Sequence, residues 1–211
     1  KLEKFLDRVY IVDDGSTDGS AQSVDDLGAT IVTFDENRGK GFAMLAGFQA
    51  ALESPDVAAV VILDADGQHD PEELPHLYAA FVEHDADLLI GARTFQRQEV
   101  PWTSWFGNSL TAGLTRALLR QPIPDTQSGY RIHSRRFVED VLATIPGGRY
   151  ETEMAILVKA AREGYRLVSE PIRTIYEEGN RSSHFNRLRD SYRIYRTFLL
   201  SAFRPARTGK H

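Results

Sequence analysis

Short runs of apolar and β-branched residues alternate with longer amphipathic stretches along the first half of the chain. The apolar runs predict strands at residues 9–12, 30–34, 58–63 and 87–91. The amphipathic stretches predict helices at residues 20–27, 39–53 and 71–83. Strands and helices that alternate in this order favour an α/β fold, with a mostly parallel sheet covered by helices on both faces. Such sheets bind their ligands at the carboxyl ends of the strands.

The second half of the chain is less regular. Helices are predicted at residues 110–119, 135–142 and 151–162, and a strand pair or an extended segment at residues 167–176. A polar loop is predicted between them, at residues 125–131. Because no internal repeat or linker interrupts the pattern, we expect one catalytic domain over residues 1–185. A basic and aromatic helical segment is expected to follow at residues 186–211.

Composition narrows the possible partners and metal ligands. The chain has 211 residues, a formal net charge of −5 and no cysteine. The negative charge argues against nucleic acid as a partner, and the lack of cysteine excludes disulfides and thiolate metal ligands. A metal would therefore need oxygen or histidine ligands. A chain without cysteine also fits a reducing compartment.

The charge is unevenly distributed, because residues 181–207 carry seven arginines, five aromatic residues and a single acid. A basic and aromatic segment on an acidic domain suggests contact with an anionic membrane surface or with phosphate. An amphipathic helix packed on the domain is an equally good interpretation. No apolar run reaches the roughly 20 residues needed to cross a bilayer.

The strongest chemical signal is the motif that follows the apolar run at residues 58–63. Asp64, Asp66 and Gln68 place two carboxylates and an amide directly after a buried strand. Buried carboxylates need compensation, and Mg²⁺ or Mn²⁺ is often held by one or two carboxylates together with substrate phosphates. The alternative is a capped turn with Asp70 as the N-cap of the next helix. That alternative explains Asp70 but leaves Asp64 and Asp66 unexplained.

A second acidic motif follows the first strand. Asp13 and Asp14 are placed to accept hydrogen bonds from a nucleotide base or ribose, as acids do in dinucleotide-binding folds. The same region also matches the ligand spacing of a calcium loop at Asp14, Ser16, Asp18, Gly19 and Asp25. That motif requires a helix before it, whereas residues 9–12 predict a strand. Asp18 is alternatively the N-cap of the following helix.

Two glycine-containing segments are weaker signals. Residues 37–41, with the sequence Asn-Arg-Gly-Lys-Gly, precede a predicted helix, where glycines allow close approach of a ligand and the helix N-terminus favours anions. Taken alone, the segment is more often a simple helix-entry turn. Residues 176–185 combine glycine, serine, arginine and histidine in a loop that could close over phosphate oxygens, although a plain surface loop is the simpler interpretation.

Taken together and in this order, the motifs resemble family 2 glycosyltransferases of the GT-A fold. The likeness is greatest to the branch with dolichol-phosphate mannose synthase and bacterial polyprenyl-phosphate glycosyltransferases. The matching segments are residues 12–19, 37–41, 64–69, 91–93 and 125–131. The family normally begins with a further strand that ends in a Pro-x-Tyr-Asn-Glu-like segment. This chain shows no such segment, so we expect the first strand of the fold to be missing.

The resemblance implies roles for individual residues. Asp13, Asp14 and Lys40 would bind the nucleotide sugar, and Asp64 and Asp66 would contact its diphosphate. The metal, Mg²⁺ or Mn²⁺, would be held by Asp64, Asp66 and Gln68. Four residues would be catalytic: Asp66, Arg93, Arg131 and Glu153. Three residues of a mobile closing loop would face the acceptor together with Arg131: Arg181, Ser182 and His184.

The predicted reaction is an inverting displacement at the anomeric carbon of a nucleotide-diphosphate sugar. An alcohol acceptor needs a general base, for which Glu153 and Glu151 are the candidates. A phosphate acceptor needs cations instead, which Arg93, Arg131 and Arg181 could supply. The arginine-rich segment favours a polyprenyl phosphate, and hence a cytoplasmic protein at the inner face of the cell membrane.

Other functions are compatible with parts of the pattern. Transfer to a saccharide hydroxyl, and a non-catalytic remnant that binds a sugar nucleotide, both remain alternatives. A haloacid-dehalogenase-type phosphatase also places an Asp-x-Asp-Gly loop after a buried strand. It would leave Asp13 and Asp14 unexplained, and that family usually has Thr or Val where this chain has Gln68.

Overall fold

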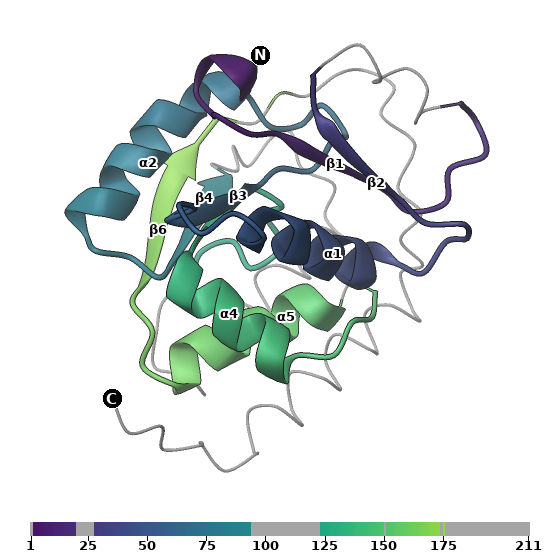
Figure 1. The fold of residues 1–211 in the computed structure, drawn as a ribbon. Helices are drawn as coiled ribbons and strands as arrows, with labels where there is room; N and C mark the ends of the chain where they lie inside the picture. Colours follow the sequence, from purple (N-terminus) through teal and green to yellow (C-terminus); the bar gives the residue numbers. More distant parts are fainter. Residues whose placement is uncertain (1, 20–27, 94–122, 150, 174, 176–211) are drawn as a thin grey trace, which may run out of the picture.

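The computed structural model describes residues 2–19, 28–93, 123–149, 151–173 and 175. They form an α/β fold in which strands and helices largely alternate (Figure 1). The strands are β1 (Tyr10–Asp13), β2 (Thr30–Thr33), β3 (Ala59–Ile62), β4 (Leu88–Arg93), β5 (Arg131–Ser134) and β6 (Leu167–Ile172). The α-helices are α1 (Lys40–Leu52), α2 (Leu74–Glu83), α4 (Arg135–Thr144) and α5 (Glu151–Arg162). Two short 3-10 helices are η1 (Leu2–Lys4) and η3 (Pro71–Glu73).

The main sheet has four strands in the order β3-β5-β4-β6. β4 and β6 are parallel, whereas β5 lies antiparallel between β3 and β4. Three of the four strands therefore run in one direction, in agreement with the predicted mostly parallel sheet. β1 and β2 form a separate parallel pair.

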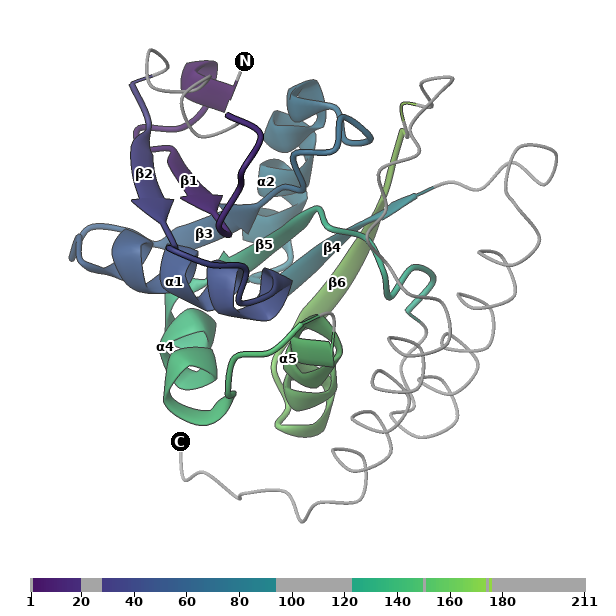
Figure 2. The ribbon, with the colours of Figure 1, turned by 90° about the vertical axis from the view of Figure 1, so that its right-hand side faces the viewer.

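Helices cover both faces of the main sheet, as predicted, and β4 shows how the faces are divided (Figure 2). Leu88 and Ile90 of β4 pack into a core cluster with residues of α1, α4 and α5. Leu89, between them, packs into a second cluster with residues of α2. Alternate side chains of a strand point to opposite faces, so an unbroken apolar run is buried on both sides.

The two sheets are held side by side without a hydrogen-bonded ladder between them. Among the described residues, β1 pairs only with β2, and β3 pairs only with β5. Helix α1 packs against both β1 and β3. Arg8, before β1, donates two hydrogen bonds to the carboxylate of Asp56, before β3. The family's usual first strand, which we expect to be missing, is not among the described elements.

Most predicted elements are confirmed to within a few residues. Asp70 is an N-cap, since its carboxylate accepts a hydrogen bond from the Glu72 amide, but the first turn that follows is η3 rather than α-helix. Strand β5 was not predicted, because three of its four residues are polar and they directly follow a polar loop. Of the two alternatives for residues 167–176, the described part of this segment fits the extended one, with the single strand β6. The helices predicted at residues 20–27 and 110–119 lie outside the described residues.

Candidate active site

The predicted site residues converge at one edge of the main sheet. Asp64 follows the carboxyl end of β3, and Arg93 ends β4. Because β5 runs in the opposite direction, it begins at this edge, where Arg131 pairs with Ile62 of β3 and Ile90 of β4. The sheet thus gathers residues that are far apart in sequence, as expected for the carboxyl ends of parallel strands.

Lys40, the first residue of α1, lies at the centre of this group. Its Nζ donates a hydrogen bond to Oδ2 of Asp64 at 2.8 Å and lies 3.2 Å from Oε2 of Glu153 in α5. Burial by itself lowers the pKa of Lys40, but the carboxylates of Glu153 and Asp64 outweigh it and raise the pKa above its usual value. Lys40 is therefore a cation shared by two candidate functional carboxylates.

Asp64 is held from its other side by the backbone of Gly129. A Cβ atom at residue 129 would overlap the Asp64 carboxylate, so only glycine allows this approach. Gly129 does not have a positive φ, so glycine is favoured here by the lack of space for a side chain and not by the backbone conformation. The loop at residues 125–131 therefore fixes the position of the first carboxylate of the acidic motif.

Arg131 is buried and faces the backbone of its own loop. Its side chain is 1% exposed, and its guanidinium donates to the carbonyl oxygens of Ser128, Thr126 and Glu153. A guanidinium nitrogen also lies 3.9 Å from the Glu153 carboxylate. The resemblance implied contact with acceptor or phosphates. The contacts described here anchor the loop beside Glu153.

Arg93 forms a two-point ion pair with Asp125. The distances are 2.7 Å from Nε to Oδ2 and 3.1 Å from the guanidinium to Oδ1. Asp125 is fully buried and also accepts hydrogen bonds from the amides of Arg93 and Gln127. Fixed geometry of this kind makes arginine–carboxylate pairs strong. Asp125 thus joins the end of β4 to the loop that carries Gly129.

The two acids at the end of β1 have different structural partners. Asp13 is buried and accepts a hydrogen bond from the amide of Ser16. The Asp14 carboxylate accepts hydrogen bonds from the amides of Arg38 at 2.7 Å and Gly39 at 2.9 Å. Asp14 therefore fixes the two residues that lead into α1, from a distant part of the sequence, while α1 itself has no side-chain cap. A strand precedes this motif, as predicted, which argues against a calcium loop.

The guanidinium of Arg38 lies between two aromatic rings of the same region. Its Cζ is 5.1 Å from the ring centre of Phe34 and 5.0 Å from that of Phe42. Gly39 has a φ of 108° and packs so closely on Gly148 and Arg149 that a Cβ would collide with Arg149. The entry to α1 is consequently tightly held, and Lys40 projects from a rigid base.

The residues predicted to hold a metal have suitable chemistry. Asp64 and the exposed Asp66 offer carboxylate oxygens, and Gln68 offers an amide oxygen. Asp66 accepts a hydrogen bond from the Gln68 amide, so the three residues share one tight turn. The Lys40 ammonium against Asp64 shows that this carboxylate already accepts a cation. Among the described residues no group of three His, Cys, Asp or Glu could hold a metal. Substrate phosphates would therefore have to complete the coordination.

His69 is a feature of the site to which the sequence assigned no role. It is buried against Tyr130, with ring centres 5.7 Å apart, and its Nδ1 has no hydrogen-bond partner in the structure. Burial lowers the pKa of His69 in spite of the nearby carboxylates of Asp64 and Asp66. A neutral histidine directly after the acidic motif is a packing element between that motif and β5.

After β6 the chain passes the acidic motif, since the amide of Ile175 donates to the carbonyl oxygen of Gln68 at 3.0 Å. The predicted closing-loop residues Arg181, Ser182 and His184 follow shortly afterwards, but they lie outside the described residues. The basic segment at residues 186–211 lies outside them as well. No helix in the described ranges is long and apolar enough to cross a membrane.

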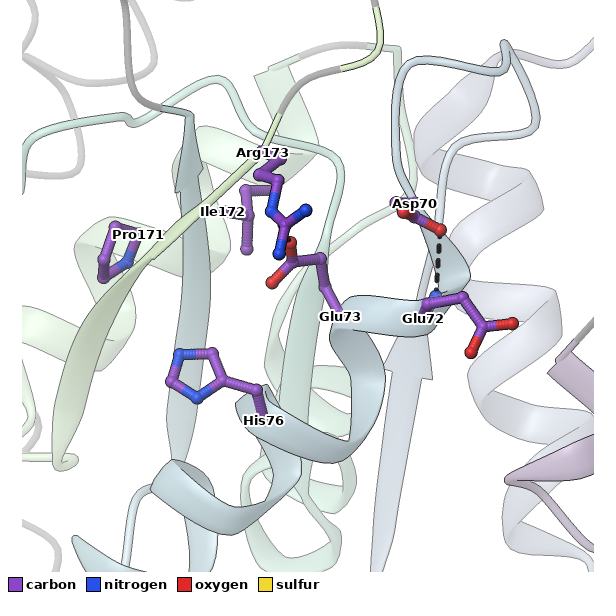
Figure 3. Close-up of a pocket in the computed structure, with 7 residues that line it drawn as sticks. All are labelled: Asp70, Glu72, Glu73, His76, Pro171, Ile172 and Arg173. Atoms are coloured by element: carbon purple, nitrogen blue, oxygen red, sulfur yellow. Dashed lines mark hydrogen bonds and ion pairs between the residues drawn. The ribbon is translucent and has the colours of Figure 1, made fainter.

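A separate cavity of about 510 Å³ lies between η3, the start of α2 and the end of β6 (Figure 3). Across it, Arg173 approaches Glu73 to 3.4 Å. His76 comes within 4.0 Å of Glu170 nearby. The residues that line the cavity include none of the cluster around Lys40, so the cavity does not belong to the predicted nucleotide-sugar site.

Comparison with known proteins places these features in a family. The sequence model described as glycosyl transferase family 2 matches residues 2–142. Polyprenol monophosphomannose synthase of Mycolicibacterium smegmatis is 32% identical over 78% of this chain and 65% of its own length. Undecaprenyl-phosphate mannosyltransferase of Micrococcus luteus is 31% identical, with coverages of 81% and 72%. A UDP-N-acetylglucosamine–dolichyl-phosphate N-acetylglucosaminyltransferase of Methanococcus voltae is 26% identical, with coverages of 92% and 85%.

The fold is also found among solved structures. Glucosyl-3-phosphoglycerate synthase from Mycobacterium tuberculosis, in complex with Mn²⁺, UDP and glucosyl-3-phosphoglycerate, superposes with a TM-score of 0.68 at 20% identity. The match covers 96% of this chain and 71% of that one. The predicted GT-A fold is thereby confirmed, although so low an identity says nothing about a shared acceptor.

Proposed function

The chain belongs to glycosyl transferase family 2, and we propose that it transfers a sugar from a nucleotide-diphosphate donor to a polyprenyl phosphate, with inversion at the anomeric carbon. The family and the glycosyltransferase activity are the premise. The acceptor, the stereochemistry, the metal and the individual residue roles are the proposal. Three relatives, from two bacteria and an archaeon, are named for polyprenyl- or dolichyl-phosphate acceptors, which supports this choice.

The surroundings of Glu153 favour a phosphate acceptor. Transfer to a saccharide hydroxyl requires a general base that is free to take a proton. Glu153 instead lies 3.2 Å from the Lys40 ammonium and 3.9 Å from the Arg131 guanidinium. The Glu153 carboxylate is thus engaged by two cations, whereas an anionic acceptor needs no base at all. Glu153 then serves to hold Lys40 and the loop of Arg131 in place.

The remaining residues would bind the metal and the nucleotide or position the loop at residues 125–131. Asp64, Asp66 and Gln68 would hold Mg²⁺ or Mn²⁺, which neutralises charge on the departing nucleoside diphosphate. Asp13 and Asp14 would position the nucleotide, Asp13 at the turn after β1 and Asp14 through the glycine segment that it holds. The pair of Arg93 and Asp125 would keep the loop of Gly129 in register with β4. A lipid-linked acceptor would bring this edge of the sheet to a membrane surface.

The test is a transfer assay with a panel of UDP-, GDP- and dTDP-sugars in the presence of Mn²⁺. Polyprenyl phosphate in detergent and soluble saccharides are offered as alternative acceptors. A lipid product whose anomeric configuration, measured by NMR, is opposite to that of the donor would support the proposal. Glycosylation of saccharides alone would refute the acceptor. Full activity of Asp66→Ala without added metal would refute the metal assignment, with Asp70→Ala as the control for a neighbouring acid.

A further inference from the structure

Lys40 makes the same contact with Asp64 that a metal ion would make. Its Nζ lies 2.8 Å from Oδ2 of Asp64 and 3.2 Å from Oε2 of Glu153. We propose that Lys40 and the divalent metal compete for Asp64, so that metal binding moves the ammonium away from this carboxylate while Glu153 retains it. The inference rests on the proposed function, since it assumes that the acidic motif binds a metal.

A divalent metal and the Lys40 ammonium cannot both occupy Oδ2 of Asp64. The ammonium lies 2.8 Å from this oxygen, and the carboxylate packs so closely on Gly129 that a Cβ atom added there would overlap it. Two cations on one carboxylate oxygen would repel each other strongly at the short separation this requires. A metal that takes Oδ2 therefore displaces the ammonium from Asp64.

Lys40 is the mobile partner. Its side chain is 28% exposed and ends in an ammonium on a flexible four-carbon stem. The backbone below it is closely packed, since a Cβ at Gly41 would collide with Thr152 and one at Gly39 with Arg149. The exchange is consequently a swing of the Lys40 side chain about Glu153, with helix α1 held in place.

This competition couples the metal to the nucleotide. An ammonium released from Asp64 becomes available to a diphosphate that binds at the start of α1. Bound diphosphate in turn stabilises the released position and so favours the metal. Such coupling is reciprocal, and its usual size is a factor of about 5 to 150 in affinity. Metal alone is thus expected to bind weakly, and metal with a nucleoside diphosphate much more strongly.

The experiment measures Mn²⁺ affinity by isothermal titration calorimetry, with and without UDP and GDP. In the absence of nucleotide, Lys40→Gln should bind Mn²⁺ about tenfold more tightly than the wild type, and Lys40→Met likewise, because the competing cation is gone. Lys40→Arg, which keeps the charge, should stay close to the wild type. In both neutral variants the gain in Mn²⁺ affinity on adding nucleotide should shrink.

Lys159 provides a matched control within the same protein. Its Nζ lies 2.6 Å from carboxylate oxygens of both Asp140 and Glu163, so it also bridges two acids, but between α4 and the end of α5. Lys159→Gln should lower thermal stability without changing Mn²⁺ affinity. A change of equal size in both lysine variants would mean that the effect of Lys40 comes from general loosening of the fold.

The outcomes separate the inference from the proposed function. Equal or weaker Mn²⁺ binding in the folded Lys40→Gln or Lys40→Met variant overturns the competition. If neither variant is folded without metal, Mn²⁺ should restore the circular dichroism spectrum of the wild type, and failure to do so also overturns it. A wild type that binds no Mn²⁺ even with nucleotide refutes the proposed metal site itself.

Discussion

Gly129→Ala is the sharpest test of the geometry of the acidic motif. The added Cβ would overlap the Asp64 carboxylate, which is confined between residue 129 and Lys40. Because the backbone at residue 129 has no positive φ, alanine fits the main chain and only the side-chain space is violated. The carboxylate must therefore move, by an amount on the order of 1 Å, to restore an ordinary contact distance.

The displacement sets the size of the expected effect. A misplacement of about 1 Å in a reacting assembly costs roughly 10²-fold in rate, which corresponds to about 2.7 kcal/mol of transition-state stabilisation. We expect kcat/KM for sugar transfer to fall by about that factor. The Mn²⁺-dependent rise in melting temperature should fall as well, since Asp64 is a proposed ligand.

The control is Gly47→Ala in the middle of α1, where the added Cβ would meet only the Val12 side chain, at 3.2 Å. Alanine favours helix by up to about 1 kcal/mol at such a position, so this variant should stay folded and keep its activity. If Gly129→Ala retains kcat/KM within a factor of about two while remaining folded, the contact does not position Asp64 and the reasoning fails.

Three further predictions concern stability. Asp125→Asn breaks the buried pair with Arg93 and should lower the free energy of unfolding by about 3 kcal/mol, measured by urea denaturation; a loss below about 1 kcal/mol would contradict it. His133 is fully buried, and burial lowers its pKa to about 3. The fold favours the neutral form of His133. Its contribution to the free energy of unfolding is therefore complete above a pH of about 6.5 and falls as the pH drops towards 3. When the pH is lowered from 7 to 5, the free energy of unfolding of His133→Leu should therefore fall by about 2 kcal/mol less than that of the wild type; equal decreases would refute this. Ser134→Ala removes the N-cap that accepts a hydrogen bond from the Phe137 amide and should lower the free energy of unfolding by about 1 kcal/mol in urea denaturation; an unchanged value would contradict this.

The sequence by itself determined the local elements and the type of chemistry. A continuous apolar run is typical of a strand packed on both faces, so the run at residues 58–63 predicted strand β3 without knowledge of its neighbours. The half-buried side chains of β3 do pack against both core clusters. The Asp70 cap is equally local, because its carboxylate bonds an amide two residues away. Acidic residues directly after strands indicated a metal and nucleotide site, because parallel strands present their carboxyl ends together.

Only the tertiary structure decided which of these residues meet. Insertion of β5 against the direction of its neighbours brings Arg131 into the sheet and turns its guanidinium towards backbone carbonyls, although its sequence resembles an exposed loop. Asp14 holds an amide 24 residues away, and Lys40 joins Asp64 to Glu153. Such contacts depend on strand order and on glycines that admit close packing. Neither leaves a periodic signal in the sequence, because hydrophobic periodicity records burial but not the identity of the neighbour.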